Sequence, residues 1–194
     1  MTTTEFKIVE EPQKPLSMHP KKFALWLFIA SVVMLFASLT SAYIVREAEG
    51  NWVYFELPKL FYVTSVIVIL SSITMQLSYI SAKKDNLGQV KLWVVLTVIL
   101  GVSFLVGQVL AWRELVLNSI YFVGNPSGSF LYVLTGLHGF HLVSGVIFLL
   151  VVLNATFKSN VHSKKLPMIE MCLTYWHFLG VLWLYLFVFL LMTR

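Results

Sequence analysis

Charged residues divide the chain into five long apolar runs. None of these runs contains Asp, Glu, Lys or Arg, and they cover residues 23–45, 60–82, 92–112, 115–157 and 171–193. A helix needs about 20 apolar residues to cross the hydrocarbon core of a bilayer, which is ~30 Å thick. Each run is long enough for that, so the pattern predicts membrane-spanning helices.

The fourth run is longer than one span needs and contains a turn signal. Its segment "FVGNPSGS" combines Gly, Pro, Asn and Ser, which favour a turn. We therefore expect a helix from about Ser129 to about Thr156, with Leu115–Val123 too short to span and lying at the membrane interface. The five predicted helices cover about 23–45, 60–82, 91–112, 129–156 and 171–193.

Every connection between these helices is short, which leaves no room for an inserted soluble domain. In lipid, a helix satisfies its backbone polar groups internally. The predicted fold class is all-α, an integral membrane bundle of five transmembrane helices over residues 23–194. Residues 1–22 are polar and contain three prolines, so they are predicted to form a flexible cytoplasmic tail.

Composition agrees with a membrane protein. Of the 194 residues, 58% are hydrophobic and 12% are charged, whereas soluble domains have about 25% charged residues. The mean hydropathy is +0.82. The single cysteine, Cys172, excludes an intramolecular disulfide and a cysteine cluster for a metal.

Lysine and arginine lie mostly on one side of the predicted bundle. Ten of the 14 fall there: Lys7, Lys14, Lys21, Lys22, Lys83, Lys84, Lys91, Lys158, Lys164 and Lys165. The other side holds Arg46, Lys59, Arg113 and Arg194. Because basic loops stay in the cytoplasm, we expect a cytoplasmic N-terminus and a C-terminus outside. This asymmetry explains the basic pI without a nucleic-acid partner.

Small and polar residues indicate where the helices pack, because they let helix backbones approach closely in lipid. The candidates are Ser31, Ala37, Ser38, Ser41, Ala42, Gly101, Gly107, Gly136, Gly139, Ser144 and Gly145. Gln108 is expected to hydrogen-bond across a helix interface.

Three histidines lie inside the predicted helices, where a polar ring needs a partner. His138 and His141 share one face of the fourth helix, and His177 lies in the fifth. Haem or metal ligation is one hypothesis. At about 1.5 Å of rise per residue, His141 and His177 differ in depth by about 6 Å. No carboxylate or thiolate in the membrane adds to the set, so at most one bis-histidine haem could form.

Two other hypotheses compete for these histidines. A proton or ion path usually places Asp or Glu in the membrane, but Glu114 and Glu170 lie only at the ends of predicted spans. In a structural role, neutral imidazoles hydrogen-bond to helix carbonyls or to the Tyr and Trp side chains of the fifth helix. The structural role agrees best with the residues present.

Four segments resemble helices of one known family. "LTGLHGFHLVSGV" and "YWHFLGVLWLYLFVFLL" are similar to the two most characteristic helices of cytochrome c oxidase subunit III. "WLFIASVVMLFASLTSAYIVR" resembles that family's helix ending in Ala-Tyr and an Arg, and "GVSFLVGQVLAWREL" resembles its helix with a Gly–Phe–Gln pattern. The resemblance runs from about Phe23 to Met192 and is to the short, five-helix bacterial form.

The resemblance implies a non-catalytic core subunit of a respiratory haem–copper oxidase in the bacterial inner membrane. Such a subunit packs on subunit I, binds phospholipid, and supports turnover and proton uptake in a complex that reduces oxygen and pumps protons. It implies no cofactor in this chain, with haem and copper in partner subunits I and II. Cytochrome c is then an indirect partner, and further subunits are expected to cover the face left by two missing helices.

Three positions depart from the family's pattern by lacking a carboxylate. The family often has Glu after the serine of its first retained helix, where Val32 stands here. Its aspartate after "YWHF" is replaced by Gly180, and the carboxylate before the aromatic of the third helix is replaced by Ala111. No role of those carboxylates can be transferred to this chain.

At the matching positions, the resemblance implies interface and packing roles and no catalytic or metal-binding residue. Arg46 is expected to contact lipid phosphate or subunit I, and Trp183 to face the partner. The other candidate residues are expected to hold the bundle together: His138, His141, Trp176 and His177. The alternatives are subunit III of a quinol oxidase, an accessory subunit of a nitric oxide reductase, a small b-type haem protein and a transporter.

Overall fold

The structure, a computed structural model, describes residues 20–157 and 166–193. These residues form five helices and no strand: α1 (Pro20–Ala48), α2 (Leu60–Lys83), α3 (Leu87–Leu117), α4 (Pro126–Phe157) and α5 (Leu166–Met192). All five are long and apolar enough to span a membrane. The predicted all-α class with five spans is therefore confirmed.

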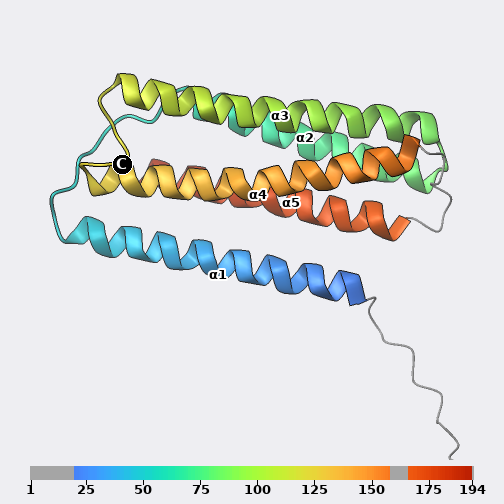
Figure 1. Cartoon of the computed structure of the whole chain (residues 1–194), viewed down its shortest axis with the longest axis horizontal. Helices are drawn as coiled ribbons and strands as arrows, with labels where there is room; N and C mark the ends of the chain where they lie inside the picture. The colour runs from blue at the N-terminus through green and yellow to red at the C-terminus, as the bar shows by residue number, and fades with distance from the viewer. Residues whose placement is uncertain (1–19, 158–165, 194) are drawn as a thin grey trace, which may run out of the picture.

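The helices alternate in direction and lie side by side in one bundle (Figure 1). α2 packs against α3 and α5, and α4 packs against α3 and α5, so these four helices form a closed set. α1 packs mainly on α4 and α5, and it lies at the edge of the bundle. Because the number of spans is odd, α1 begins at one end of the bundle and α5 finishes at the other.

Most helix ends lie beyond the predicted bounds, whereas α5 ends at Met192, one residue short of its predicted end. α1 begins at Pro20, so residues 20–22 belong to the helix and not to the predicted tail, while residues 1–19 lie outside the described part. Proline is tolerated there because the first helical N–H groups have no partner within the helix.

The segment Leu115–Val123, expected at the membrane interface, is divided between two elements. Its first three residues complete α3, and the rest forms the turn before α4. α4 begins at Pro126, earlier than predicted, because Asn125 caps it: Asn125 Oδ1 accepts from Ser127 N at 2.9 Å. The turn signal therefore starts the helix instead of delaying it.

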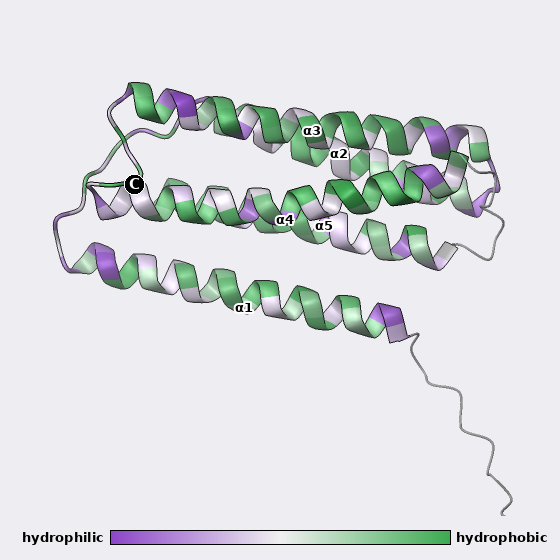
Figure 2. Ribbon diagram, viewed as in Figure 1, coloured by the Kyte–Doolittle hydropathy of each residue, from purple (hydrophilic) through white to green (hydrophobic). Residues whose placement is uncertain are grey.

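Large apolar side chains cover the outside of the bundle. Figure 2 shows apolar residues along all five helices and polar ones gathered toward the helix ends. Leu27, Met34, Ile99 and Phe140 are among the large side chains that are exposed. A surface of this kind requires a bilayer as its solvent.

Glycines bring the helices close at three of the predicted points. A Cβ at Gly101 would lie 2.7 Å from the Trp176 ring, one at Gly107 would lie 2.5 Å from the Thr64 methyl group, and one at Gly145 would lie 2.8 Å from Leu179. Only a residue without a side chain allows these approaches. Gly139 is different, since a Cβ there would meet nothing within 4 Å.

The prediction for the small residues of α1 is wrong within this chain. The helix buries larger side chains at helical spacing: Ile29, Val32, Phe36, Thr40 and Tyr43. The predicted small residues are all exposed: Ser31, Ala37, Ser38, Ser41 and Ala42. They lie away from the bundle, because α1 is held by large side chains filling the space beside α4 and α5.

Candidate functional site

The interior of the bundle carries a layer of polar groups that bond between helices. Tryptophan N–H groups of α5 donate to serines of α2: Trp183 Nε1 to Ser65 Oγ at 3.0 Å and Trp176 Nε1 to Ser71 Oγ at 3.1 Å. Gln108 Nε2 of α3 donates to Thr64 Oγ1 of α2 at 3.2 Å, as predicted. Such bonds fix how two helices are rotated against each other in lipid.

The α2 partners of these bonds were not singled out from the sequence. Thr64, Ser71 and Ser78 recur every seventh residue of α2, and all three are buried. Ser65 and Thr74 are buried as well, and Thr74 bonds Thr97 of α3 at 2.8 Å between their hydroxyls. Hydroxyls repeating at heptad spacing in an apolar run were the signal that could have identified this face.

His138 is fully buried where α3, α4 and α5 meet. Its ring lies 5.2 Å from the Trp183 ring and 5.9 Å from the Phe104 ring, measured between centroids. Neither ring nitrogen has a hydrogen-bond partner among the described residues. The expectation of a Tyr or Trp hydrogen bond to this imidazole is therefore wrong here, because the aromatic neighbours present ring carbons.

His141 faces α1 from the same helix. Its Nδ1 lies 2.7 Å from the carbonyl oxygen of Leu137, one turn back, so the ring donates to its own helix. The ring lies 5.9 Å from that of Phe36 and 6.3 Å from that of Phe28. Tyr175 of α5 adds a hydroxyl that donates to the His141 carbonyl at 3.3 Å. His141 therefore lies where α1, α4 and α5 meet.

His177 faces α2 on the outer side of the bundle. Its Nε2 lies 3.2 Å from Gln76 Oε1, and this pair is exposed. The three rings thus face different neighbours: His138 the centre, His141 α1, and His177 α2. Within residues 20–157 and 166–193, no group of three or more His, Cys, Asp or Glu side chains is placed to hold a metal ion.

Trp183 does not face outward. Its side chain is 0% exposed, with edge-to-face contacts to Phe61 at 5.7 Å and Phe104 at 5.0 Å. The prediction that Trp183 faces a partner subunit is at odds with this position, which the chain's own α2, α3 and α4 fill. Trp176 is also buried, against Gly101 and Gly145.

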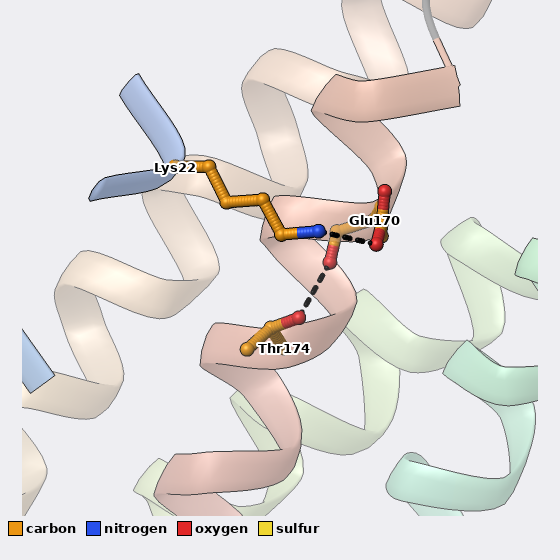
Figure 3. A network of polar contacts seen from close by, with 3 residues as sticks. All are labelled: Lys22, Glu170 and Thr174. Carbon is orange, nitrogen blue, oxygen red and sulfur yellow. Dashed lines mark hydrogen bonds and ion pairs between the residues drawn. The ribbon is translucent and has the colours of Figure 1, made fainter. Parts of the chain in front are cut away.

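Arg46 lies at the end of α1 away from the lysine-rich side. It pairs with Glu49 three residues on, at 2.7 Å, and its side chain is 38% exposed. At the other end of α1, Lys22 pairs with Glu170 of α5 at 2.8 Å, and Thr174 Oγ1 donates to the Glu170 carbonyl at 2.9 Å (Figure 3). Both ion pairs are partly exposed, so each contributes about 0–1 kcal/mol of stability.

The three positions that lack the family's carboxylates are all buried. Val32 and Ala111 lie in the apolar core. A Cβ at Gly180 would lie 3.0 Å from Ser72 Oγ, so α5 approaches α2 closely there. An ionised carboxylate at any of these positions would require a buried partner, which the apolar packing here does not supply.

These features define a multi-pass helical membrane protein. Its outside is apolar, and its interior is tied together by hydroxyl, amide and indole groups that bond from helix to helix.

Comparison with known proteins gives the family. The family described as Cytochrome c oxidase subunit III matches residues 13–193, and the chain belongs to it. It is thus a subunit III of the haem–copper oxidase type, which associates with other oxidase subunits.

Individual relatives support this assignment. Cytochrome c oxidase subunit 3 of Bacillus sp. strain PS3 is 27% identical over 192 residues, covering 96% of this chain and 92% of that protein. The protein of the same name from Corynebacterium diphtheriae is 30% identical, covering 84% and 82%. Cytochrome bo(3) ubiquinol oxidase subunit 3 of Buchnera aphidicola is 28% identical, covering 91% and 95%.

Proposed function

We propose that this chain is a non-catalytic accessory subunit of a bacterial terminal oxidase. It packs on subunit I, beside subunit II, and holds no haem or copper itself. The observation that carries this proposal is the family match over residues 13–193. The separate surroundings of the three membrane histidines agree with it, because each ring faces different neighbours.

The subunit's contribution to the complex is to bind phospholipid and to sustain turnover and proton uptake by subunit I. The apolar outer surface supports contact with lipid chains. Arg46, near the opposite membrane surface from the lysines, is suited to a lipid phosphate or to the surface of subunit I. The complex as a whole reduces oxygen to water and pumps protons.

The chain lies in the bacterial inner membrane with its N-terminus in the cytoplasm. The helix order places Lys21, Lys22, Lys83, Lys84 and Lys91 at one end of the bundle, where α1 begins, α2 ends and α3 begins. Basic residues concentrate on the cytoplasmic side of membrane proteins. The C-terminus then lies on the periplasmic side.

The electron donor of the complex is proposed to be cytochrome c, because the Bacillus and Corynebacterium relatives carry that name. The Buchnera relative is named as part of a ubiquinol oxidase and covers the chain equally well, so a quinol donor is the second candidate. A copper-site motif in the neighbouring subunit II would favour cytochrome c. An accessory role in a nitric oxide reductase is a more distant alternative.

Two alternatives from other classes have less support. A small b-type haem protein would bring two histidine rings face to face, but His141 faces Phe28 and Phe36 of α1, and His177 faces Gln76 of α2. A proton-coupled transporter usually carries carboxylates in mid-membrane. Within the described spans, Glu170 lies close to the start of α5, and Glu114 close to the end of α3.

The proposal is tested by affinity purification of the tagged chain from membranes in mild detergent, followed by subunit masses and an optical spectrum. We expect a large haem-bearing subunit and a subunit II to purify with the chain in constant ratio. Purification of the chain without any haem-bearing partner would contradict the proposal. The masses would also show whether a quinol oxidase or a cytochrome c oxidase is assembled.

A further inference from the structure

A groove on the outer surface between α2 and α5 holds polar atoms within apolar walls. Its volume is about 400 Å³, and Ile69, Ile73, Leu77 and Val181 are among its apolar lining residues. Ser72, Gln76 and His177 line it as well. We refer to it as the α2–α5 groove.

The side chains of Gln76 and His177 make fewer hydrogen bonds within the chain than their polar atoms allow. His177 Nε2 lies 3.2 Å from Gln76 Oε1, and this is the hydrogen bond that the described residues supply to either side chain. Since the amide oxygen can only accept, the ring donates and its Nδ1 is left as a free acceptor. The amide N–H groups of Gln76 are left as free donors. Turning the amide over exchanges donors and acceptors but still leaves one ring nitrogen unused.

These atoms lie too deep for lipid headgroups. Gln76 is about 10 Å from the Lys83 end of α2 and about 24 Å from the Leu60 end, at about 1.5 Å per residue. Acyl chains fill the membrane at that depth and offer no hydrogen bonds. An exposed amide there is costly, so the groove calls for an occupant that supplies hydrogen-bonding groups at that depth.

Beside the groove, α2 and α5 approach each other closely. α5 carries Gly180 next to Ser72, where a Cβ would lie only 3.0 Å from Ser72 Oγ. Small side chains at this point keep α2 and α5 close together. A third helix can then pack close to both α2 and α5, because small residues promote helix packing in lipid.

We propose that the α2–α5 groove seats a transmembrane helix of another subunit of the oxidase. That helix presents a hydrogen-bonding side chain, such as Ser, Thr or Asn, to Gln76 and His177. The inference rests on the proposed function, because it takes the partner from the same complex. A lipid chain or a second copy of this chain are the competing occupants, and each would give a different outcome in the following test.

The first test is photocrosslinking in intact membranes. A photoreactive side chain at Ile73 lies in the groove, and one at Ile99, on the exposed face of α3, is the matched control. We expect the Ile73 probe to attach to a spanning segment of one other oxidase subunit, and the Ile99 probe not to reach that segment. Attachment of the Ile73 probe only to lipid, only to a second copy of this chain, or to nothing would overturn the proposal.

The second test measures how strongly the chain is retained. A hydrogen bond between membrane helices changes the equilibrium constant for their association by about three-fold to about twenty-fold. Gln76→Leu should weaken retention of the chain in the detergent-washed complex by a factor in that range. Ser103→Ala, at an exposed serine of α3 that bonds only its own helix, should leave retention unchanged.

Equal retention of the Gln76→Leu and unchanged chains would count against the proposal. The oxidase role of the chain and the docking of a helix in the α2–α5 groove can be tested separately. If the unchanged chain purifies without a haem-bearing subunit, the proposed function is wrong. If it purifies with one but the Ile73 probe reaches only lipid, the oxidase role stands and the helix-docking groove does not.

Discussion

At the residue scale, the polar side chains of the interior are used mainly to join helices. His141 illustrates this, since its Nδ1 donates to the Leu137 carbonyl at 2.7 Å while its ring contacts Phe28 and Phe36 of α1. We expect a residue used in this way to affect the stability of the bundle.

The substitution His141→Phe tests whether this histidine has a structural role in the bundle. Phenylalanine keeps the ring contacts but loses the hydrogen bond, so we expect the bundle to lose about 1 kcal/mol of stability. Thermal unfolding of the purified chain in detergent measures the loss. The haem spectrum of the assembled oxidase should not change, and loss of a haem band from assembled complex would contradict a packing role.

The Trp183–Ser65 bond links α5 to α2 and can be measured by a double-mutant cycle. Trp183→Phe and Ser65→Ala each remove one side of the 3.0 Å hydrogen bond. The coupling energy between the two changes should be about 0.6–1.7 kcal/mol, as found for hydrogen bonds between membrane helices. Stability in a denaturant series would give each corner of the cycle, and a coupling of zero would show that the bond is not formed.

The sequence predicted some of these residue roles and missed others. Gln108 was expected to bond across helices and does so with Thr64. Trp183 was expected to face a partner, yet it is buried, because an apolar helix shows no polarity difference between its lipid face and its packed face. For the same reason, the unpartnered state of His138 could not be read from spacing alone.

At the element scale, close approach of helices depends on glycine at specific crossings. The Trp176 ring of α5 lies against Gly101 of α3 and Gly145 of α4. Both glycines therefore set the distance between α5 and its two neighbours. Gly139, on the same helix as Gly145, has open space where a Cβ would point.

Gly101→Ala should destabilise the bundle, because the new methyl group would lie 2.7 Å from a Trp176 ring atom. The ring is too rigid and too well packed to move freely, so a cost of about 1–3 kcal/mol is expected from overpacking. Gly139→Ala is the matched control and should be neutral or slightly stabilising, since alanine favours the helix. Unfolding of both variants in detergent compares them, and equal stabilities would refute the proposed crossing.

The apolar runs predicted that five helices form. They did not predict at which residue each helix ends or which of its sides packs against the bundle. All five spans were predicted, and four of the predicted helix ranges lie fully within the observed helices. The fifth, predicted over residues 171–193, ends one residue beyond Met192. The face of α1 was misjudged, because small residues mark close packing only where a partner helix is present.

At the scale of the whole molecule, α1 is held less firmly than the other helices. It packs mainly on α4 and α5, and less extensively than α2 packs on α3. Polar interactions with α5 and the residue after it lie along its length: Lys22 with Glu170, Thr40 with Tyr185, and Tyr43 with the Thr193 carbonyl. Its remaining faces are apolar and exposed.

Amide hydrogen exchange of the isolated chain in detergent should therefore be fastest in α1 among the five helices. Local opening follows the density of buried contacts, so α1 can detach while α2–α5 stay packed. In the assembled oxidase we expect this difference to shrink, because a partner would cover α1. Protection of α1 equal to that of α3 in the isolated chain would contradict this account.

Two long motifs were enough to predict the family from the sequence. The contacts of the chain with partner subunits could not be predicted in the same way. "LTGLHGFHLVSGV" and "YWHFLGVLWLYLFVFLL" contain the buried histidines and tryptophans whose positions the bundle requires. Outward-facing positions face lipid or partners that one chain does not specify. The exposed Gln76 with His177 is the exception, since an amide within the apolar span of α2 favours a hydrogen-bonding partner.

The central claim is that this chain is an oxidase subunit that carries no haem, and haem partition tests it most directly. The tagged complex would be purified, the chain separated from it in stronger detergent, and haem measured in both fractions by optical spectrum. The account predicts that all haem stays with the large partner subunit and that the separated chain is colourless. Haem that remains bound to the separated chain, and is lost on substitution of His141 or His177, would contradict it.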